Sequence, residues 1–363
     1  MDHVIIYKKE GRYAGWPANY GIWSWGNEIV LAFTVGYHKS KAGFHSLDKS
    51  KPFMSMQARS LDGGRAWAVR ETPCRKPGGR GLSADEHMNE GMGVGDVLDG
   101  RNAPKGCPGG IDFLHPDFAL MCAKTGLSEG VTSFFYTSTN RCYSWRGPYQ
   151  LPMFCQKGIA ARTDYLVSGP AECMLFLTAN KRNGLEGRVF CAKTANGGKS
   201  FHFVAWIGPE PEGFSIMPAS VRISPAIILI AVRCRGAVGR THEASNWIDL
   251  WASNDRGATW RYQNTPVANT GKGGNPPTLT KLQDGRLCLT YGYRDAPYGI
   301  RAKLSQDDGR TWSEEIILRD DAGSHDIGYP RTVQRPDGKV LTAYYYNDHP
   351  NRERYIAATI WDP

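Results

Sequence analysis

The motif S-x-D-x-G-x-T-W recurs along the chain, and it constrains the fold more than any other feature of the sequence. Five copies are recognisable, at residues 60–67, 138–145, 194–201, 253–260 and 305–312. The last two fit at every fixed position, the first has Ala66 in place of Thr, and the other two have Asn in place of Asp. A short Asp or Asn side chain can bond the backbone two residues on, and Gly supplies a positive φ. Each copy therefore predicts a tight corner between two strands.

The spacing of the copies predicts a repeat architecture. The Asp and Asn anchors stand at 62, 140, 196, 255 and 307, so successive copies are 78, 56, 59 and 52 residues apart. A period of about 40 to 60 residues with four short strands in each unit is typical of β-propellers rather than helical solenoids. The longest interval contains an insertion at roughly 74–110. We interpret it as a loop over the substrate face or as surface decoration.

A second repeat marks the innermost strand of each unit. Extended segments begin at Pro17, Pro218, Pro277 and Pro330, and Arg162 holds the equivalent place without a proline. Proline suits the first residue of a strand because no ladder donor is needed there. These positions keep step with the S-x-D-x-G-x-T-W copies, so we expect each to begin the first strand of a blade.

The last unit ends the chain after three strands. The N-terminal segment 3–9 (HVIIYKK) is a fourth strand of suitable pattern, and its pairing there closes the ring and removes the open sheet edges. The sequence therefore predicts an all-β fold, a single six-bladed β-propeller domain over residues 1–363.

The repeated motif is the Asp-box, and on its copies and their spacing the chain resembles the sialidase superfamily. Members of that superfamily are six-bladed β-propellers with Asp-boxes at the blade corners. The resemblance covers nearly the whole chain. It implies a glycoside hydrolase that acts at the end of an acidic glycan.

The topology predicts two functional faces. Because the Asp-boxes join third to fourth strands, all of them are expected on one face. The starts of first strands, and the loops between second and third strands, are then expected on the opposite face around the central channel. Ligands are expected on that second face, where the blades converge.

The resemblance implies two catalytic residues on the ligand face. Asp48, twelve residues before Ser60, matches the general acid that protonates the leaving oxygen. Tyr329, at the start of the sixth blade, matches the nucleophile, because an anionic substrate repels a carboxylate nucleophile. Simpler roles are also open, since Asp48 fits a solvated loop acid and Tyr329 an ordinary strand aromatic.

The resemblance also implies arginines that bind a sugar carboxylate. Arg233 and Arg294 end the second strands of blades four and five, and converging guanidiniums offer planar paired donors to a carboxylate. Arg301 competes with Arg294 for this role, and Arg162 and Asp164 share the face as a ligand pair or as a structural ion pair. Ion pairing between blades is the alternative role for Arg233 and Arg294.

Two positions depart from the superfamily pattern. Gly15 stands where the first blade usually carries an Arg, and Arg12 is the nearest basic substitute. Met217 stands where blade four usually carries the Glu that supports the tyrosine. The missing Arg and Glu indicate a substrate other than ordinary sialosides.

Loss of the Glu raises the question of how Tyr329 is activated. A phenol of unperturbed pKa near 10 is a poor nucleophile at neutral pH, so it needs a base or a positive field. Nearby guanidiniums can lower its pKa by favouring the phenolate. Asp326, three residues earlier, and Glu243, in the blade-four loop, are the candidate bases.

Two other functions remain open. A polysaccharide lyase acting on uronate-containing chains would use His115 or a Tyr as its base, with a hydrogen-bonded turn as the plainer role of His115. A non-catalytic sugar-binding propeller would bind glycans without turnover. Formation of an unsaturated uronate distinguishes the lyase from a hydrolase.

The composition indicates which classes of binding partner to expect. The net charge of +9, from 44 basic and 35 acidic residues, favours anionic partners. No basic run with interleaved aromatics is present, so an acidic glycan is expected rather than nucleic acid. No run approaches the roughly 20 apolar residues of a membrane span. The segment after Met1 does not read as a leader, so we expect a cytoplasmic protein unless a leader was removed.

The remaining chemistry is expected to need no cofactor. The sequence has no HExxH, HxH or Cys/His cluster, so no catalytic metal is predicted. It has no glycine-rich phosphate loop and no GxSxG elbow. The nine cysteines lack CxxC pairing, and Cys122, Cys173, Cys191 and Cys288 lie in apolar runs, which predicts buried reduced thiols.

Overall fold

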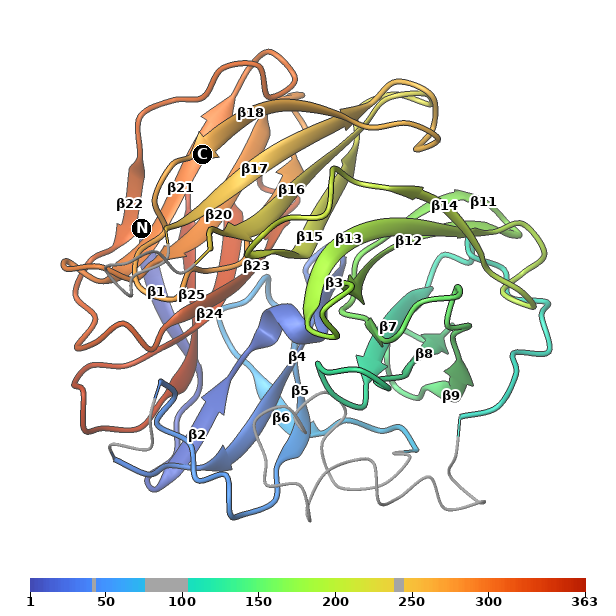
Figure 1. Ribbon diagram of the computed structural model, residues 1–363. Helices are drawn as coiled ribbons and strands as arrows, with labels where there is room; N and C mark the ends of the chain where they lie inside the picture. Colours follow the sequence, from blue (N-terminus) through green and yellow to red (C-terminus); the bar gives the residue numbers. More distant parts are fainter. Residues whose placement is uncertain (41–43, 76–103, 238–244) are drawn as a thin grey trace.

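The computed structural model describes residues 1–40, 44–75, 104–237 and 245–363, and it is built from six antiparallel sheets arranged in a ring (Figure 1). The six-bladed β-propeller predicted from the repeats is therefore confirmed. The described residues contain one short 3₁₀ helix, η1 (Pro17–Asn19), and no helix long and apolar enough to cross a membrane.

The first three blades follow the chain in order. Blade one contains β2 (Arg12–Gly15), β3 (Gly21–Trp25), β4 (Glu28–Tyr37), β5 (Met54–Ser60) and β6 (Ala68–Glu71). Blade two contains, among the described residues, β7 (Ala119–Lys124), β8 (Ser133–Ser138) and β9 (Arg146–Gln150). Blade three contains β10 (Ile159–Ala160), β11 (Tyr165–Gly169), β12 (Glu172–Asn180), β13 (Glu186–Thr194) and β14 (His202–Trp206). Most of the predicted insertion at 74–110 lies outside the described residues.

The last three blades have four strands each. Blade four contains β15 (Phe214–Arg222), β16 (Ile228–Arg235), β17 (Asn246–Ser253) and β18 (Arg261–Val267). Blade five contains β19 (Thr278–Lys281), β20 (Leu287–Tyr293), β21 (Gly299–Ser305) and β22 (Ile316–Arg319). Blade six contains β23 (Gly328–Gln334), β24 (Val340–Tyr346), β25 (Tyr355–Trp361) and β1 (Asp2–Tyr7).

The N-terminal strand closes the ring as predicted. β1 pairs antiparallel with β25, and the order of the sheet is β1-β25-β24-β23 (Figure 1). The chain then enters blade one, where the Ala14 N–H donates to the Arg354 carbonyl at 2.8 Å. Both ends of the chain are thus held in one sheet, which leaves no open seam between the first and last blades.

The hydrophobic core is divided among the six junctions between neighbouring blades. Successive strand residues point to opposite faces, so each blade packs on both neighbours. In β7, Leu120 and Cys122 pack against blade three, whereas Ala119 and Met121 pack against blade one. The four cysteines expected inside strands are buried free thiols, as predicted.

The prolines of the inner repeat differ in detail from the prediction. In blades four and six the strand begins before the proline, and the register of pairing shifts across Pro218 and Pro330. In blade one, Pro17 opens η1, which separates β2 from β3. A proline supplies no ladder donor, so Pro218 and Pro330 lie at bulges within their strands, whereas in blade five β19 begins at Thr278, directly after Pro277, as expected.

All five Asp-boxes join third to fourth strands, and they therefore lie on one face, as predicted. In the last box, Ser305 Oγ accepts the Gly309 N–H at 2.8 Å, and Asp307 Oδ1 accepts the Thr311 N–H at 2.9 Å. The Asp bond thus reaches four residues on, not two. Gly309 has φ 76°, and Asp308 before it is also left-handed with φ 55°.

The two boxes with Asn in place of Asp show why Asn is tolerated there. Asn140 Oδ1 accepts the Ser144 N–H at 3.0 Å, and its Nδ2 donates to Ser144 Oγ at 2.8 Å. The amide thus reproduces the turn of a complete box without a charge.

We expect the charged boxes to make the fold sensitive to acid. Hydrogen bonds from the Thr311 hydroxyl and N–H lower the pKa of Asp307 from 3.8 to about 2. Because the folded pKa is depressed, the stabilisation is present above about pH 4 and is lost as the pH falls towards 2. Asp307→Asn should change the thermal midpoint little at neutral pH and flatten its decline in this acid window.

Thermal unfolding of the wild type, Asp307→Asn and Asp307→Ala across this range provides the measurement. The Ala variant lacks the acceptor and should lose about 1 kcal/mol at neutral pH. An Asn variant with the same acid dependence as the wild type would contradict the assignment.

Candidate functional site

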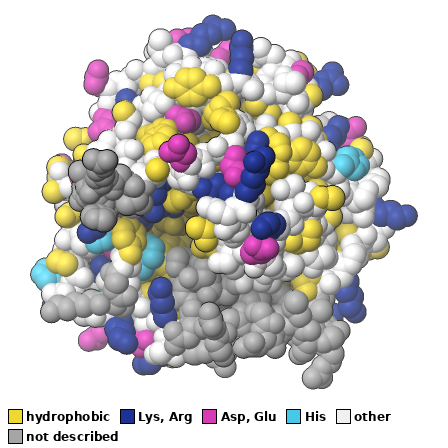
Figure 2. All heavy atoms as spheres, viewed as in Figure 1, with side chains coloured by type: hydrophobic (Ala, Val, Ile, Leu, Met, Phe, Trp, Pro, Cys, Tyr) yellow, Lys and Arg dark blue, Asp and Glu magenta, His cyan; other side chains and the backbone are white. Residues whose placement is uncertain are grey.

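The face opposite the Asp-boxes gathers the starts of first strands and the ends of second strands. In the space-filling view, basic side chains and histidines lie near a hollow among apolar side chains at the middle of the ring (Figure 2). Tyr329 at the start of β23 and Arg233 at the end of β16 both belong to this face. Two of the predicted site residues are thus brought together.

The backbone of Tyr329 is held in an unusual conformation. Tyr329 has φ 51°, and the equivalent residues Trp16 and Met217, each also followed by proline, have φ 59° and 52°. Left-handed backbone is uncommon for residues with bulky side chains, and it persists only where surrounding contacts impose it. The Tyr329 N–H donates to Asn275 Oδ1 at 2.8 Å, and a Cβ at Gly328 would collide with the same amide.

Arg233 contacts the tyrosine directly. Its NH1 donates to Tyr329 Oη at 3.2 Å and approaches Met217 Sδ at 3.5 Å, while NH2 donates to the Gly273 carbonyl at 2.6 Å. The side chain is 7% exposed, and its Nε is a buried donor with no partner among the described residues. A buried, unpartnered guanidinium N–H favours binding of a hydrogen-bond acceptor from outside the protein.

A second arginine, which the sequence analysis missed, lies beside the first. Arg235 NH2 donates to the same Gly273 carbonyl at 2.7 Å, and its Nε donates to Asn246 Oδ1 at 3.0 Å. Burial and the charge of Arg233 lower the pKa of Arg235. Neither guanidinium has a carboxylate partner among the described residues, so this pair of like charges is suited to an anion.

The guanidinium of Arg294 donates all its hydrogen bonds to acceptors within the protein. Its Nε and NH2 donate to the Ile327 carbonyl at 3.0 and 2.8 Å, NH1 donates to Gly274 at 2.9 Å, and NH2 also donates to Tyr345 Oη at 2.7 Å. The side chain is 1% exposed. Its guanidinium carbon lies 5.6 Å from the Tyr329 ring centroid, so Arg294 contributes positive charge rather than free donors.

Arg162 is also near the tyrosine and is also paired. Its Nε donates to Asn19 Oδ1 at 3.1 Å, and its two terminal nitrogens bond both oxygens of Glu186. The neighbouring acid of the sequence, Asp164, instead accepts the N–H and hydroxyl of Ser220. Arg162 therefore forms a structural ion pair, but with Glu186.

The arginines act together on the phenol. Burial alone would raise the pKa of Tyr329, but the charges of Arg233, Arg294 and Arg162, with the hydrogen bond from Arg233, lower it below its ordinary value. A positive field is thus the feature that favours the phenolate, in place of a neighbouring base.

Asp326 does not serve as that base. Its Oδ1 accepts from His45 Nδ1 at 2.7 Å and from Tyr345 Oη at 2.9 Å, and its Oδ2 accepts from the Ser46 N–H and Arg354 Nε at 3.0 and 2.9 Å. Burial opposes its ionisation, but His45 and Arg354 hold the pKa of Asp326 far below its usual range. The carboxylate is fully engaged, and the proposed base role is not supported.

Asp48 lies in the loop between β4 and β5, as predicted. Its Oδ1 accepts the Ser50 hydroxyl and N–H at 2.6 and 3.1 Å, and Lys39 Nζ lies 3.7 Å away. The Ser50 hydroxyl is the main cause that lowers the pKa of Asp48. Arg12 stacks on the Tyr37 ring with its guanidinium carbon 3.9 Å from the centroid, beside this loop.

Two further predicted residues lie away from the tyrosine. Arg301 donates to the Arg319 and Pro297 carbonyls at 2.5 and 3.0 Å within blade five. His115 lies on the Asp-box face, where its Nδ1 accepts the Asp117 N–H and Asp117 in turn pairs with box residue Arg141. The proposed lyase base is therefore on the opposite face. Glu243 lies outside the described residues.

The two departures from the superfamily pattern have structural consequences. A Cβ at Gly15 would lie 2.7 Å from the Tyr13 ring, so Tyr13 fills the space of the missing side chain. Met217 contacts Arg233 where a carboxylate would otherwise neutralise it. Both changes leave the site without an added charge from these positions.

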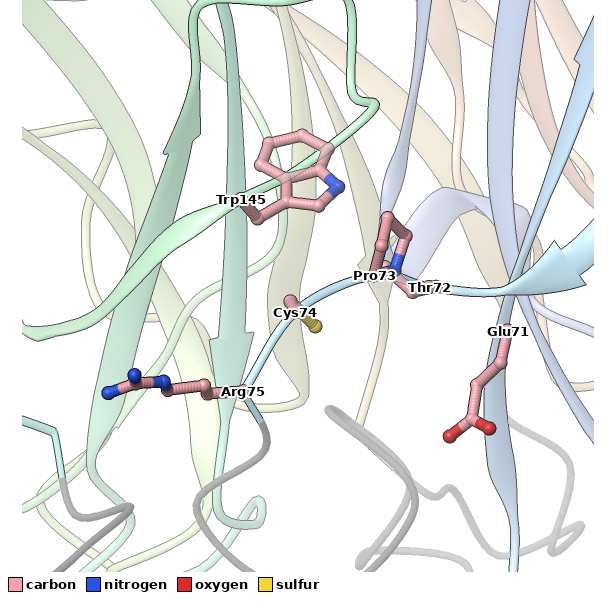
Figure 3. Close-up of a pocket in the computed structure, with 6 residues that line it drawn as sticks. All are labelled: Glu71, Thr72, Pro73, Cys74, Arg75 and Trp145. Atoms are coloured by element: carbon pink, nitrogen blue, oxygen red, sulfur yellow. The ribbon is translucent and has the colours of Figure 1, made fainter.

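A hollow of about 460 Å³ lies elsewhere, between blades one and two. It is lined by Glu71, Thr72, Pro73, Cys74, Arg75 and Trp145, and Figure 3 shows Arg75 and Glu71 on opposite sides, with the Arg75 side chain extended away from the other residues. Its charged groups do not converge on a common point, and none of the predicted site residues lines it. No group of three His, Cys, Asp or Glu side chains suited to a metal occurs in the described part of the chain.

The family model of the BNR repeat-like domain matches residues 118–341. The chain belongs to this family. A search of curated proteins found no match to the chain. The BNR repeats correspond to the Asp-box corners described above, so the family assignment and the observed fold agree.

Solved structures with the same fold include glycoside hydrolases. A Dyadobacter fermentans protein of unknown function superimposes with TM-score 0.74 and 20% identity, covering 100% of this chain and 98% of its own. The Streptococcus pneumoniae NanB sialidase superimposes with a TM-score of 0.59 and 10% identity, and the match covers 99% of this chain and 70% of the sialidase. The Penicillium chrysogenum α-L-arabinanase superimposes with a TM-score of 0.60 and 11% identity, and the match covers 99% of this chain and 98% of the arabinanase. At these low identities, the three structural matches show that the BNR repeat-like chain shares their fold.

We expect the site arginines to control the ionisation of Tyr329. In an ultraviolet difference titration of the wild type against Tyr329→Phe, the phenolate absorbance should appear at a lower pH than that of an ordinary tyrosine. In Arg233→Met the band should move to higher pH, because a positive charge and a hydrogen bond to the phenolate are lost. Tyr262→Phe, which removes an exposed tyrosine of β18, is the control for the loss of one phenol. An unchanged band in Arg233→Met would show that the guanidinium does not control this group.

Proposed function

We propose that this propeller is an exo-acting glycoside hydrolase for a glycan that ends in an acidic sugar. The observation that carries the proposal is the buried Tyr329 phenol beside Arg233 and Arg235, two guanidiniums without carboxylate partners among the described residues. The sialidase and arabinanase with the same fold support hydrolysis of a glycosidic bond as the reaction class.

The chemistry of the nucleophile suits an anionic substrate. A carboxylate nucleophile repels a sugar carboxylate, and sialidases use a tyrosine instead. Here Tyr329 would attack the anomeric carbon, and the field of the surrounding arginines would favour its phenolate. The missing Glu is thus offset by positive charge.

The anionic group of the sugar would bind at Arg233 Nε and Arg235. An anion there satisfies the orphaned donor of Arg233 and reduces the repulsion between the two guanidiniums. Arg294 and Arg162 would hold the binding site in shape and supply charge, because their donors already have protein partners.

Asp48 holds the superfamily position of the general acid. The hydrogen bond from the Ser50 hydroxyl lowers the pKa of Asp48, so it would need a substrate-induced change before it can donate a proton. A second function, binding without turnover, is favoured by one observation: Met217 replaces the supporting Glu beside the tyrosine.

The proposal is tested with a turnover screen of acidic glycosides, sialosides and uronosides included. We expect Tyr329→Phe to lower kcat/KM on the order of 10³-fold or more, as removal of a nucleophile does in other enzymes. Arg235→Gln should raise KM about tenfold, because it removes a charge-assisted hydrogen bond worth about 1.5 kcal/mol. The amide analogue of the same sugar should lose this difference between variants.

Arg222→Gln is the matched control, since Arg222 lies at the opposite end of β15, towards the Asp-boxes. It changes the net charge equally and should leave kinetics unaltered. Turnover that survives Tyr329→Phe would refute the nucleophile, and glycan binding without any turnover would establish the binding function instead.

A further inference from the structure

An aspartate–histidine pair lies next to the tyrosine and has no role in the chemistry described so far. His45, in the loop between β4 and β5, places Nδ1 2.7 Å from Asp326 Oδ1. The two residues come from opposite ends of the chain and meet across the seam between blades one and six. His45 is half-buried, whereas Asp326 is 1% exposed.

Asp326 is built to hold that histidine in place. Its other three bonds, from Tyr345, the Ser46 N–H and Arg354, fix both carboxylate oxygens. A carboxylate fixed on Nδ1 orients the imidazole and stabilises its protonated form, so that Nε2 is the nitrogen able to transfer a proton.

The ring of His45 lies within the aromatic walls of the site. It packs edge-on against Trp16 at 5.2 Å between centroids and against Phe44 at 5.0 Å. Tyr345 contacts His45 at 6.5 Å and Tyr329 at 5.9 Å, so a single ring separates the histidine from the tyrosine. The imidazole therefore lines the same aromatic wall as Tyr329, one ring away from it.

We propose that His45, positioned by Asp326, is the group that gives a proton to the leaving oxygen and later takes one from water. The proposal rests on the proposed hydrolase function. It differs from the superfamily pattern, in which an acid at the position of Asp48 performs this step. Asp48 lies three residues further along the same loop, but its contacts with Ser50 hold its pKa low.

In the first step, the Tyr329 phenolate oxygen bonds to the anomeric carbon as the bond from that carbon to the leaving oxygen breaks. His45 Nε2 gives its proton to that oxygen, so an alcohol leaves and the imidazole becomes neutral. In the second step, Nε2 takes a proton from water, whose oxygen bonds to the anomeric carbon as the bond to Tyr329 breaks. The phenolate and the protonated histidine are restored.

The test compares leaving groups that need a proton with those that do not. The probes are the methyl and dinitrophenyl glycosides of N-acetylneuraminic acid and of glucuronic acid. For the methyl glycoside, His45→Gln should lower kcat/KM by about 10²–10⁴-fold, the usual contribution of a general acid. For the dinitrophenyl glycoside, whose leaving group departs unprotonated, the loss should be below about tenfold.

Asp326→Asn should give the same split between substrates in weaker form, because the histidine loses its orienting charge. A merely structural role would lower both rates together. Asp48→Asn is the direct competitor, and His202→Gln, an exposed histidine of β14, is the matched control. Turnover of the dinitrophenyl glycoside also proves that each variant is folded.

Each outcome decides a separate point. A substrate split in His45→Gln, with a weaker one in Asp326→Asn and none in Asp48→Asn, supports the proposal. Equal losses on both substrates, no loss, or a split that appears only in Asp48→Asn overturns the role of His45 and leaves the hydrolase function standing. No turnover of any probe by the wild type overturns hydrolysis of these sugars, and the role of His45 with it.

Discussion

The antiparallel pairing of β1 with β25 is the interaction on which the site depends. It joins the two ends of the chain in blade six, so the first blade packs directly against the last. Across this seam Tyr13 packs against Tyr345, and His45 bonds Asp326. Every contact between the β4–β5 loop and the tyrosine's own blade therefore exists only in the closed ring. Opening the ring would separate Tyr329, the proposed nucleophile, from His45, the proposed proton donor to the leaving oxygen.

Burial of several guanidiniums around one phenol is costly, and the structure distributes that cost unevenly. Arg294 and Arg162 are compensated within the protein, the first by carbonyls and Tyr345 and the second by Glu186. Arg233 and Arg235 share one carbonyl and lack an acid among the described residues. Among the described residues, Arg233 Nε is a buried donor without a partner, and such a donor is destabilising until an acceptor reaches it. In the proposed function, the compensated arginines supply a positive field and the uncompensated pair would bind the anion.

Much of the fold follows from sequence because its signals are local and periodic. The Asp-box corners and the closing strand follow from short motifs, and inner strands such as β7 and β8 are buried along their whole length because each packs on two neighbouring blades. Arg233 and Tyr329 were predictable because strand ends place them on one face. Arg235 was missed although it follows Arg233 by two residues, the spacing that places side chains on the same side of a strand. The roles of Asp326 and His45 depend on contacts between residues 281 positions apart, and no local pattern reports those.

The two departures at Gly15 and Met217 are best understood together. Gly15 removes a positive charge from the ring and Met217 removes a negative one, so the balance of charge around Tyr329 is kept while its distribution changes. Tyr13 fills the first space, and the Met217 sulfur contacts Arg233 in the second. With no carboxylate at position 217 to take its proton or to neutralise Arg233, the phenol depends on the guanidinium field for its ionisation. A site activated in this way works only if the substrate's own negative charge does not cancel that field. In the proposed site, Arg235 and Arg233 Nε would bind the anion while Arg233 NH1 stays on the phenol, so one pair of side chains would serve both tasks.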